Sequence, residues 1–201
     1  MFILTKFSDL VQIHPKEFGV LSIHALQDAI NTKYSNKLVL GIGLCICLQE
    51  IVWHSEGLVG HGDGLVNVNV EFNMVVFRPF KGETIQARIA SQTPLGMRLS
   101  TEFFDSIYIP ESHLPAGAEF NPADGIWVWK TDDQELFYDH NEIVRCKVIG
   151  EEWHDRTPTE PIDMADESAE ALAFSSRRPM YQIIGSMDDV GLGACLWWDE
   201  E

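Results

Sequence analysis

The chain has 201 residues, of which 45% are hydrophobic, and this balance excludes an intrinsically disordered protein. Its 31 acidic and 14 basic residues give a net charge of −17, which excludes a protein that holds duplex DNA by broad charge neutralisation. The longest apolar run, from Leu38 to Leu48, is too short to span a membrane, so we expect no membrane partner. The four cysteines form no C-x-x-C pair, which favours a reducing compartment over a disulfide or metal framework.

Residues 1–80 predict an α/β domain with long antiparallel strands and one helix. Residues 2–13 have an extended pattern, and Ser22 is a suitable cap for a helix that ends near Tyr34. The apolar face of this helix consists of residues at helical spacing: Ile23, Leu26, Ile30 and Tyr34.

Two strands follow the helix in this domain. Residues 38–53 form an almost continuous apolar run, which predicts a strand buried on both faces with Cys45 and Cys47 in the core. Residues 55–64 contain four glycines and predict a turn. Residues 66–74 alternate between apolar and polar side chains, so we expect a strand with one buried and one solvated face.

Residues 81–201 predict a small β-barrel. Short strands alternate with turn signals, at residues 85–89, 97–100, 107–109, 126–129 and 143–149. A short helical turn at residues 110–114 follows the third strand, and this arrangement of five strands is that of an OB fold. Residues 180–184 and 194–198 can add to the sheet. The predicted fold class is therefore α+β, an α/β domain followed by an OB-fold barrel.

An acidic insertion is predicted within the second domain, at about residues 151–179. The stretch is rich in Pro, Ser, Thr, Asp and Glu. Residues 151–201 hold 13 acidic and 3 basic residues, more than half of the charge imbalance of the chain. We interpret the insertion as a solvated segment, because charge runs favour water over a packed core.

The barrel also carries residues that suit single-stranded nucleic acid. Arg88 and Arg98 lie on its predicted strands, and Tyr108 alternates with apolar neighbours, so its ring should face outward and offer a stacking surface. Phe103 and Phe104 are interpreted as core residues. A free-standing OB-fold RNA-binding protein is one interpretation of this pattern.

A cysteine hydrolase is the enzymatic alternative. Cys146, His140 and Asp139 supply the residue types of such a site. The chain has no G-x-S-x-G elbow and no H-E-x-x-H pair, however. We therefore expect no catalytic residue, no metal site and no cofactor.

Several longer motifs resemble the stalk subunit family shared by eukaryotic and archaeal RNA polymerases. In chain order they are MFILTKFSDLVQIHP at the start, VVFRPFKGE (Val75 to Glu83), FFDSIYIPESHL (Phe103 to Leu114), WVW (Trp127 to Trp129) and GSMDDVGLGACLWW (Gly185 to Trp198). VVFRPFKGE is shared by several polymerase classes and indicates only the family. GLCICLQEI (Gly43 to Ile51), the acidic insertion and the tryptophan-rich ending most resemble the RNA polymerase III version.

The resemblance implies a non-catalytic stalk subunit of DNA-directed RNA polymerase III in the nucleus. It implies a heterodimer with a small helical subunit, docking on the polymerase core, contacts with initiation factors and weak binding of the emerging single-stranded RNA. The equivalent subunit of RNA polymerase II is the near alternative.

The resemblance also implies where these contacts lie. The polymerase-docking tip would be the glycine-rich turn, with Gly57, Gly60, His61, Gly62, Asp63 and Gly64. The RNA-binding face would use Arg88, Arg98, Tyr108 and His113. Because the first domain is nearly neutral, we expect it to dock through exposed apolar side chains, among them some of Phe2, Leu4, Phe18, Val20 and Leu21.

Overall fold

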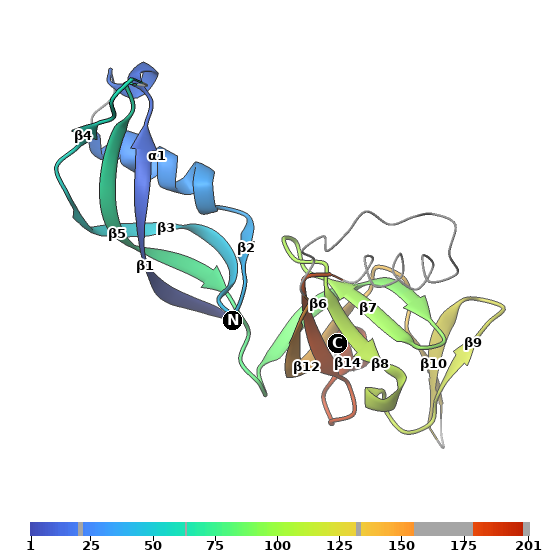
Figure 1. The fold of residues 1–201 in the computed structure, drawn as a ribbon. Helices are drawn as coiled ribbons and strands as arrows, with labels where there is room; N and C mark the ends of the chain where they lie inside the picture. The colour runs from blue at the N-terminus through green and yellow to red at the C-terminus, as the bar shows by residue number, and fades with distance from the viewer. Residues whose placement is uncertain (20–21, 63, 132–133, 155–178, 199–201) are drawn as a thin grey trace, which may run out of the picture. The chain divides into compact units, whose positions relative to one another are not determined.

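The computed structural model describes residues 1–19, 22–62, 64–131, 134–154 and 179–198. The chain divides into two compact units, Met1–Pro79 and Phe80–Glu201 (Figure 1). Most of the predicted acidic insertion, residues 155–178, lies outside the described residues, as does Asp63 of the predicted docking tip.

The first unit is built on an antiparallel sheet with the strand order β1-β5-β3-β2. Its strands are β1 (Phe2–Ile13), β2 (Lys37–Val39), β3 (Gly43–His54) and β5 (Val66–Phe77), and the short β4 (Leu58–Val59) pairs with β5. A 3-10 turn, η1 (Pro15–Glu17), follows β1, and helix α1 (Ser22–Tyr34) then packs against β1 and β3. The predicted extended segment, helix and alternating strand are confirmed.

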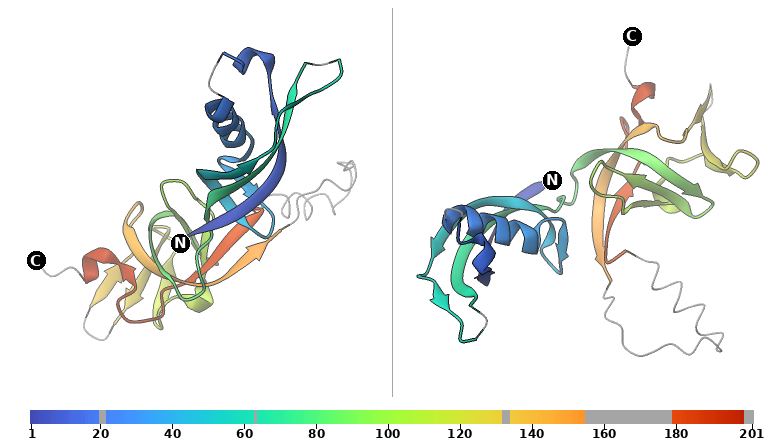
Figure 2. Two further views of the ribbon diagram at one scale, coloured as in Figure 1. Left: turned by 90° about the vertical axis from the view of Figure 1, so that its left-hand side faces the viewer. Right: turned by 90° about the horizontal axis from the view of Figure 1, so that it is seen from above.

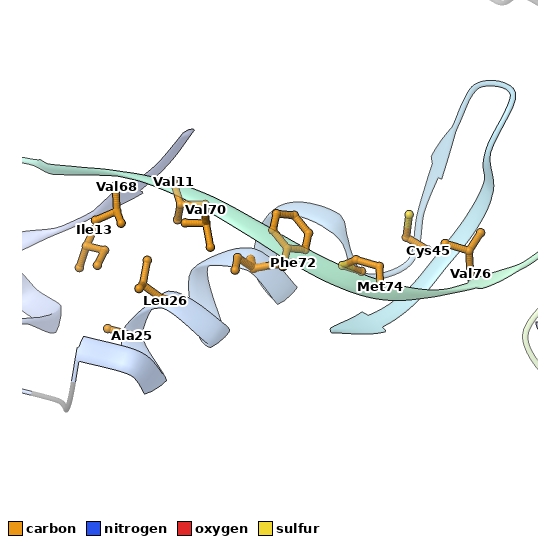
Figure 3. Packing of buried hydrophobic residues seen from close by; sticks show 11 residues of the cluster. Val11, Ile13, Ala25, Leu26, Cys45, Val68, Val70, Phe72, Met74 and Val76 are labelled. Carbon is orange, nitrogen blue, oxygen red and sulfur yellow. The ribbon is translucent and has the colours of Figure 1, made fainter. Parts of the chain in front are cut away.

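The core of the first unit lies between α1 and one face of the sheet (Figure 3). The alternation predicted for β5 is confirmed, since Val68, Val70, Phe72 and Met74 are buried while the intervening side chains are not. On the helix the buried side chains are Ala25, Leu26 and Ile30. Ile23 is exposed, so the prediction that it belongs to the buried face is wrong.

The prediction of one strand over residues 38–53 is wrong. A turn through Gly41, with φ at +74°, separates β2 from β3, and only the first three residues of β3 are buried. Strand β3 also shifts register against β5 between Cys45 and Cys47. This irregularity breaks the two-residue period, so Cys45 is buried whereas Cys47 is exposed, contrary to the prediction for Cys47.

The second unit contains a closed five-stranded barrel, seen from two further directions in Figure 2. Its strands are β6 (Thr84–Thr93), β7 (Gly96–Ser100), β8 (Ile107–Pro110), β12 (Ile143–Trp153) and β13 (Tyr181–Ser186). The ring runs β6-β7-β8-β13-β12 and back to β6, with β8 and β13 parallel and the other pairs antiparallel. The 3-10 turn η2 (Glu111–His113) follows the third strand, so the predicted OB-fold barrel is confirmed.

Two strand assignments in the second unit differ from the prediction. Residues 126–129 do form a strand, β10 (Ile126–Lys130), but it belongs to a separate three-stranded sheet with β9 (Ala118–Asn121) and β11 (Glu135–Phe137). The indole of Trp127 donates a 2.9 Å hydrogen bond to the carbonyl of Thr93, which ties this sheet to the end of β6. The fourth and fifth barrel strands are instead β12 and β13, on either side of the insertion.

The chain beyond β13 is mostly not a strand. Residues 193–194 form β14 (Gly193–Ala194), which pairs with β12, and the following η3 (Cys195–Trp197) is a 3-10 turn. The Trp197 ring packs edge-on against Tyr138 at 4.7 Å between centroids. Aromatic packing therefore replaces the strand predicted for residues 194–198.

The interior of the barrel is apolar, with the alternate side chains of its strands turned inward: Ile85, Ala87, Ile89, Met97, Leu99, Ile107, Ile109, Val144, Cys146, Val148 and Ile183. Phe104 is buried and Phe103 is exposed, so only one of the two predicted core phenylalanines is in the core. Among the described residues, no helix has the length and apolar character required to cross a membrane.

Candidate nucleic-acid interface and docking tip

A pocket of about 720 Å³ opens on the outside of the barrel, beside the β6–β7 turn and the adjoining ends of β12 and β13. Three of the four residues predicted to bind RNA line it: Arg98, Tyr108 and His113. Glu152 and Gln182 line it from β12 and β13. The volume falls within the range of pockets that enclose a small organic ligand.

The register of the barrel explains why these side chains meet. Arg98 on β7 pairs with Tyr108 on β8, and Tyr108 pairs in turn with Ile184 on β13. Cross-strand partners project to the same face of a sheet, so the three side chains form one row on the outer surface. Tyr108 lies outward between the buried Ile107 and Ile109, as its alternation predicts.

The Tyr108 ring is held by its hydroxyl, which donates a 2.8 Å hydrogen bond to the carbonyl of Leu95. Burial raises the pKa of Tyr108, and the guanidinium of Arg98 offsets part of this effect, so the hydroxyl remains a donor at neutral pH. The turn that presents Leu95 requires glycine at position 96. Its φ is +147°, and a Cβ there would lie 2.2 Å from the carbonyl oxygen of Ile109.

Arg88 does not line the pocket. It lies on β6 opposite Ser100, and its Nη1 donates a 3.4 Å hydrogen bond to the carbonyl of Asn141. The bulge between Ile89 and Ser91 lies between Arg88 and the part of β6 that borders the pocket. The structure thus groups three of the four predicted residues and leaves Arg88 on a neighbouring part of the surface.

The basic side chains of the barrel differ in whether a carboxylate already pairs with them. Nζ of Lys130 lies 2.5 Å from Oε2 of Glu119, and Nζ of Lys147 lies 2.7 Å from Oδ2 of Asp189, so each lysine has a carboxylate partner. Arg98 has no ion pair among the described residues. Its guanidinium is therefore available to donate hydrogen bonds to a phosphate group in the pocket.

Sequence reasoning missed Glu152 and Gln182 as pocket residues. They are cross-strand partners on β12 and β13, and the insertion lies between them in the chain. A pairing between segments so far apart leaves no local pattern in the sequence. The pairing of Glu152 with Gln182 could be predicted only from the OB topology, in which the fourth and fifth strands are neighbours.

The predicted docking tip is an exposed turn between β4 and β5. The amide of Gly60 donates a 2.8 Å hydrogen bond to the carbonyl of Leu65, and Gly62 has a φ of +99° that favours glycine. Leu58 and Val59 of β4 are 71% and 68% exposed. Two adjacent exposed aliphatic side chains beside a turn are a feature of docking surfaces, and sequence reasoning did not single them out.

Further apolar side chains of the first unit are exposed, as predicted. Phe2 and Leu4 lie on β1, and Phe18 follows η1. Val20 and Leu21, named in the same prediction, lie outside the described residues.

The environment of Cys146 does not suit a nucleophile. Its side chain is fully buried in the barrel, and this burial raises the pKa of the thiol to about 12. Reactive cysteines need the opposite, a lowered pKa and access to substrate. Among the described residues, no cluster of histidine, cysteine, aspartate or glutamate could hold a metal ion.

Comparison with known proteins identifies both units. Residues 8–64 match the family model of the SHS2 domain found in the N terminus of Rpb7p, Rpc25p and MJ0397. Residues 83–198, more than half of the chain, match the family model of RNA polymerase III subunit Rpc25. The two units thus define a class of proteins in which an SHS2 domain is followed by an OB-fold barrel. The chain belongs to the RNA polymerase III subunit Rpc25 family, which confirms the resemblance drawn from its motifs.

Two polymerase III subunits are similar to this chain over nearly its full length. DNA-directed RNA polymerase III subunit rpc8 of Schizosaccharomyces pombe is 36% identical over 208 residues, which cover 98% of this chain and 100% of the relative. Subunit RPC8 of Bos taurus is 36% identical over 206 residues, covering 98% of each. RNA polymerase II subunit RPB7 of Glycine max is 29% identical over 145 residues, covering 70% of this chain and 78% of the relative. The polymerase III relatives are thus more similar over more of the chain than this polymerase II relative.

Proposed function

We propose that this chain is the stalk subunit of nuclear DNA-directed RNA polymerase III and acts in transcription initiation without a catalytic site of its own. The similarity to RPC8 proteins over nearly the whole chain carries the proposal. The partners are the polymerase core, a small helical subunit and initiation factors. The first unit argues against a free-standing RNA-binding module, because such a module would not need an SHS2 domain with an exposed apolar tip.

The polymerase contact is proposed to lie at the tip of the first unit, at residues 57–64. Leu58 and Val59 would enter an apolar site on the core, since buried aliphatic contacts stabilise an interface independently of net charge. Gly62 adopts a conformation that other residues rarely adopt, so it fixes the shape of the turn that presents them.

The RNA contact is proposed to lie at the barrel pocket. OB folds bind oligonucleotides on the face of their second and third strands, between the loop joining strands one and two and the loop joining strands four and five. In this barrel that region is β7, β8, the β6–β7 turn and the ends of β12 and β13, where the pocket lies. With one arginine and one histidine engaged, binding of free RNA should be weak and should gain from the high local concentration near a polymerase.

Capture of the polymerase by a tagged chain tests the docking proposal. Replacing Leu58 and Val59 together by aspartate should reduce recovery of polymerase III core subunits from cell lysate at least tenfold, because two charges cannot enter an apolar site without a large desolvation penalty. Val190→Asp is the matched control, since Val190 is 94% exposed but lies in the second unit. Equal recovery with the double variant and the wild type would contradict docking through the tip.

A further inference from the structure

We propose that the barrel pocket accommodates a single unstacked nucleotide of RNA and that Glu152 makes it select guanine over uracil. This inference rests on the proposed function, because it specifies the ligand of the pocket assigned there to RNA. It goes beyond that function, since transcript capture by a stalk requires no preference for a base. The argument starts from the distribution of charge in the pocket.

The charged groups of the pocket lie on opposite sides. Arg98 is on β7 and His113 follows β8, whereas Glu152 is on β12. On the side of the barrel where the pocket lies, strands β8 and β13 come between β7 and β12, so Arg98 and Glu152 line opposite edges of the pocket. A ligand that spans the pocket therefore has an anionic group at one end and hydrogen-bond donors at the other.

The middle of the pocket suits a planar ring. Tyr108 and Ile184 are neighbours there, and the hydroxyl of Tyr108 is already engaged with Leu95, so its ring contributes an apolar face. Bases of single-stranded RNA stack on such rings when they are splayed out of their own stack. With a phosphate at Arg98 and a base on Tyr108, the edge of the base faces β12 and β13.

A carboxylate is unexpected in a pocket for RNA, because it repels phosphates. Glu152 nevertheless lines the pocket, with its side chain 54% exposed and its Oε2 3.5 Å from Nε2 of His154. The carboxylate becomes favourable if it accepts hydrogen bonds from a base edge. Gln182, its cross-strand partner, adds an amide that both donates and accepts.

The chemistry of the base edges makes guanine the preferred ligand. Guanine presents two adjacent donors, N1–H and the N2 amino group, which match the two oxygens of a carboxylate. Uracil presents one donor, N3–H, between two carbonyl oxygens that a carboxylate repels. Glu152 is therefore the specificity-determining residue, whereas Arg98 and Tyr108 contribute affinity for any nucleotide.

Binding of short oligonucleotides to the full chain tests the inference. The probes are a fluorescently labelled octamer of uridine and the same octamer with one central guanosine, measured by anisotropy at low salt. We expect the guanosine octamer to bind about tenfold more tightly, the size of discrimination that one good bidentate contact gives. Glu152→Gln should bring the two Kd values to within about twofold of each other, mainly by strengthening the binding of the uridine octamer.

Matched variants separate base reading from general charge. Glu135→Gln makes the same change in net charge at an exposed site on β11 outside the pocket, and it should keep the tenfold preference. Arg98→Ala should weaken the binding of both octamers and reduce the salt dependence, because one phosphate contact is lost.

Each failure has a separate meaning. Equal Kd values for the two octamers with the wild-type chain would overturn guanine selection and leave the RNA pocket in place. A preference that persists in Glu152→Gln would overturn the role of Glu152. No binding of either octamer would overturn both this inference and the RNA part of the proposed function, while the polymerase assembly would remain separately testable by capture.

Discussion

The four cysteines occupy distinct environments. Cys47 is exposed, Cys195 is half-buried, and Cys45 and Cys146 are buried. Burial raises the pKa of both buried thiols, that of Cys146 to about 12. Since only the thiolate reacts quickly with disulfide reagents, the environments set the order in which the thiols react.

With a thiol-specific reagent at pH 7.5, we expect Cys47 to react first, Cys195 more slowly, and Cys45 and Cys146 only after unfolding in urea. Cys47→Ser should remove the fast phase, and Cys146→Ser should leave it unchanged. A fast phase that persists in Cys47→Ser would contradict the outward orientation that the β3 irregularity gives this side chain.

The same burial predicts how stability depends on pH. The thiol of Cys146 ionises with a pKa near 9.0 in an exposed setting but at about 12 in the folded chain. Its contribution to the free energy of unfolding is therefore fully present below pH 9 and is lost as the pH rises from 9 through 12, because the unfolded chain releases the proton first.

At the scale of elements, helix α1 is joined to strand β1 by one carboxylate. Oδ2 of Asp9 accepts a 2.6 Å hydrogen bond from the hydroxyl of Tyr34 and another from Lys33. Burial would raise the pKa of Asp9, but the hydrogen bonds from Lys33 and Tyr34 outweigh it and the net pKa is lowered. The ionised form of Asp9 therefore stabilises the packing of the helix against the sheet.

Asp9→Asn should lower the free energy of unfolding by about 1 kcal/mol at pH 7, the size of a charge-assisted hydrogen bond with partial solvent screening. Because the folded pKa is lowered, this contribution is present above about pH 4 and disappears as the pH falls further. Urea unfolding at pH 7 and at pH 3, followed by far-UV circular dichroism, measures the loss in the free energy of unfolding at each pH.

Asp28→Asn is the control for this measurement. Asp28 is exposed on the same helix, so the substitution makes the same change in charge and should leave stability nearly unchanged. Two results would contradict this role of Asp9: an equal loss of stability in both variants, or a loss in Asp9→Asn that does not become smaller as the pH falls from 7 to 3.

Elements with a clear period were predictable from the sequence, and elements defined by distant pairing were not. The alternation over residues 66–74 predicted the buried face of β5, because one covered face needs one apolar side chain in two. The run over residues 38–53 was apolar throughout, so it contained no period from which the Gly41 turn or the irregularities in β3 could be read. Similarly, β10 and β13 look alike as isolated strands, and only pairing with β8 and β12 places β13 in the barrel.

The residues of the candidate site also differ in whether a local sequence pattern could predict them. Tyr108 was predictable because its neighbours Ile107 and Ile109 fix which side of β8 faces the core. Arg98 and His113 were expected from the family resemblance, and the register of the barrel then brought them together with Tyr108. Glu152 was not predictable, because its place in the pocket depends on the pairing of β12 with β13 across the insertion.

At the scale of the whole molecule, the two units divide the proposed function between them. The SHS2 unit has an apolar tip and only a small net charge, which suits a stable protein interface. The barrel unit carries a pocket with few cations, which suits a weak RNA contact. Under the proposed function, the chain therefore acts through these two contacts.

The most direct test of this account is affinity capture of the tagged full chain from its own cells, with quantitative mass spectrometry of what is recovered. The account predicts recovery of the RNA polymerase III large subunits together with a small helical subunit. Polymerase II subunits in their place would contradict the assignment to polymerase III, and recovery without any polymerase subunit would contradict the stalk function itself.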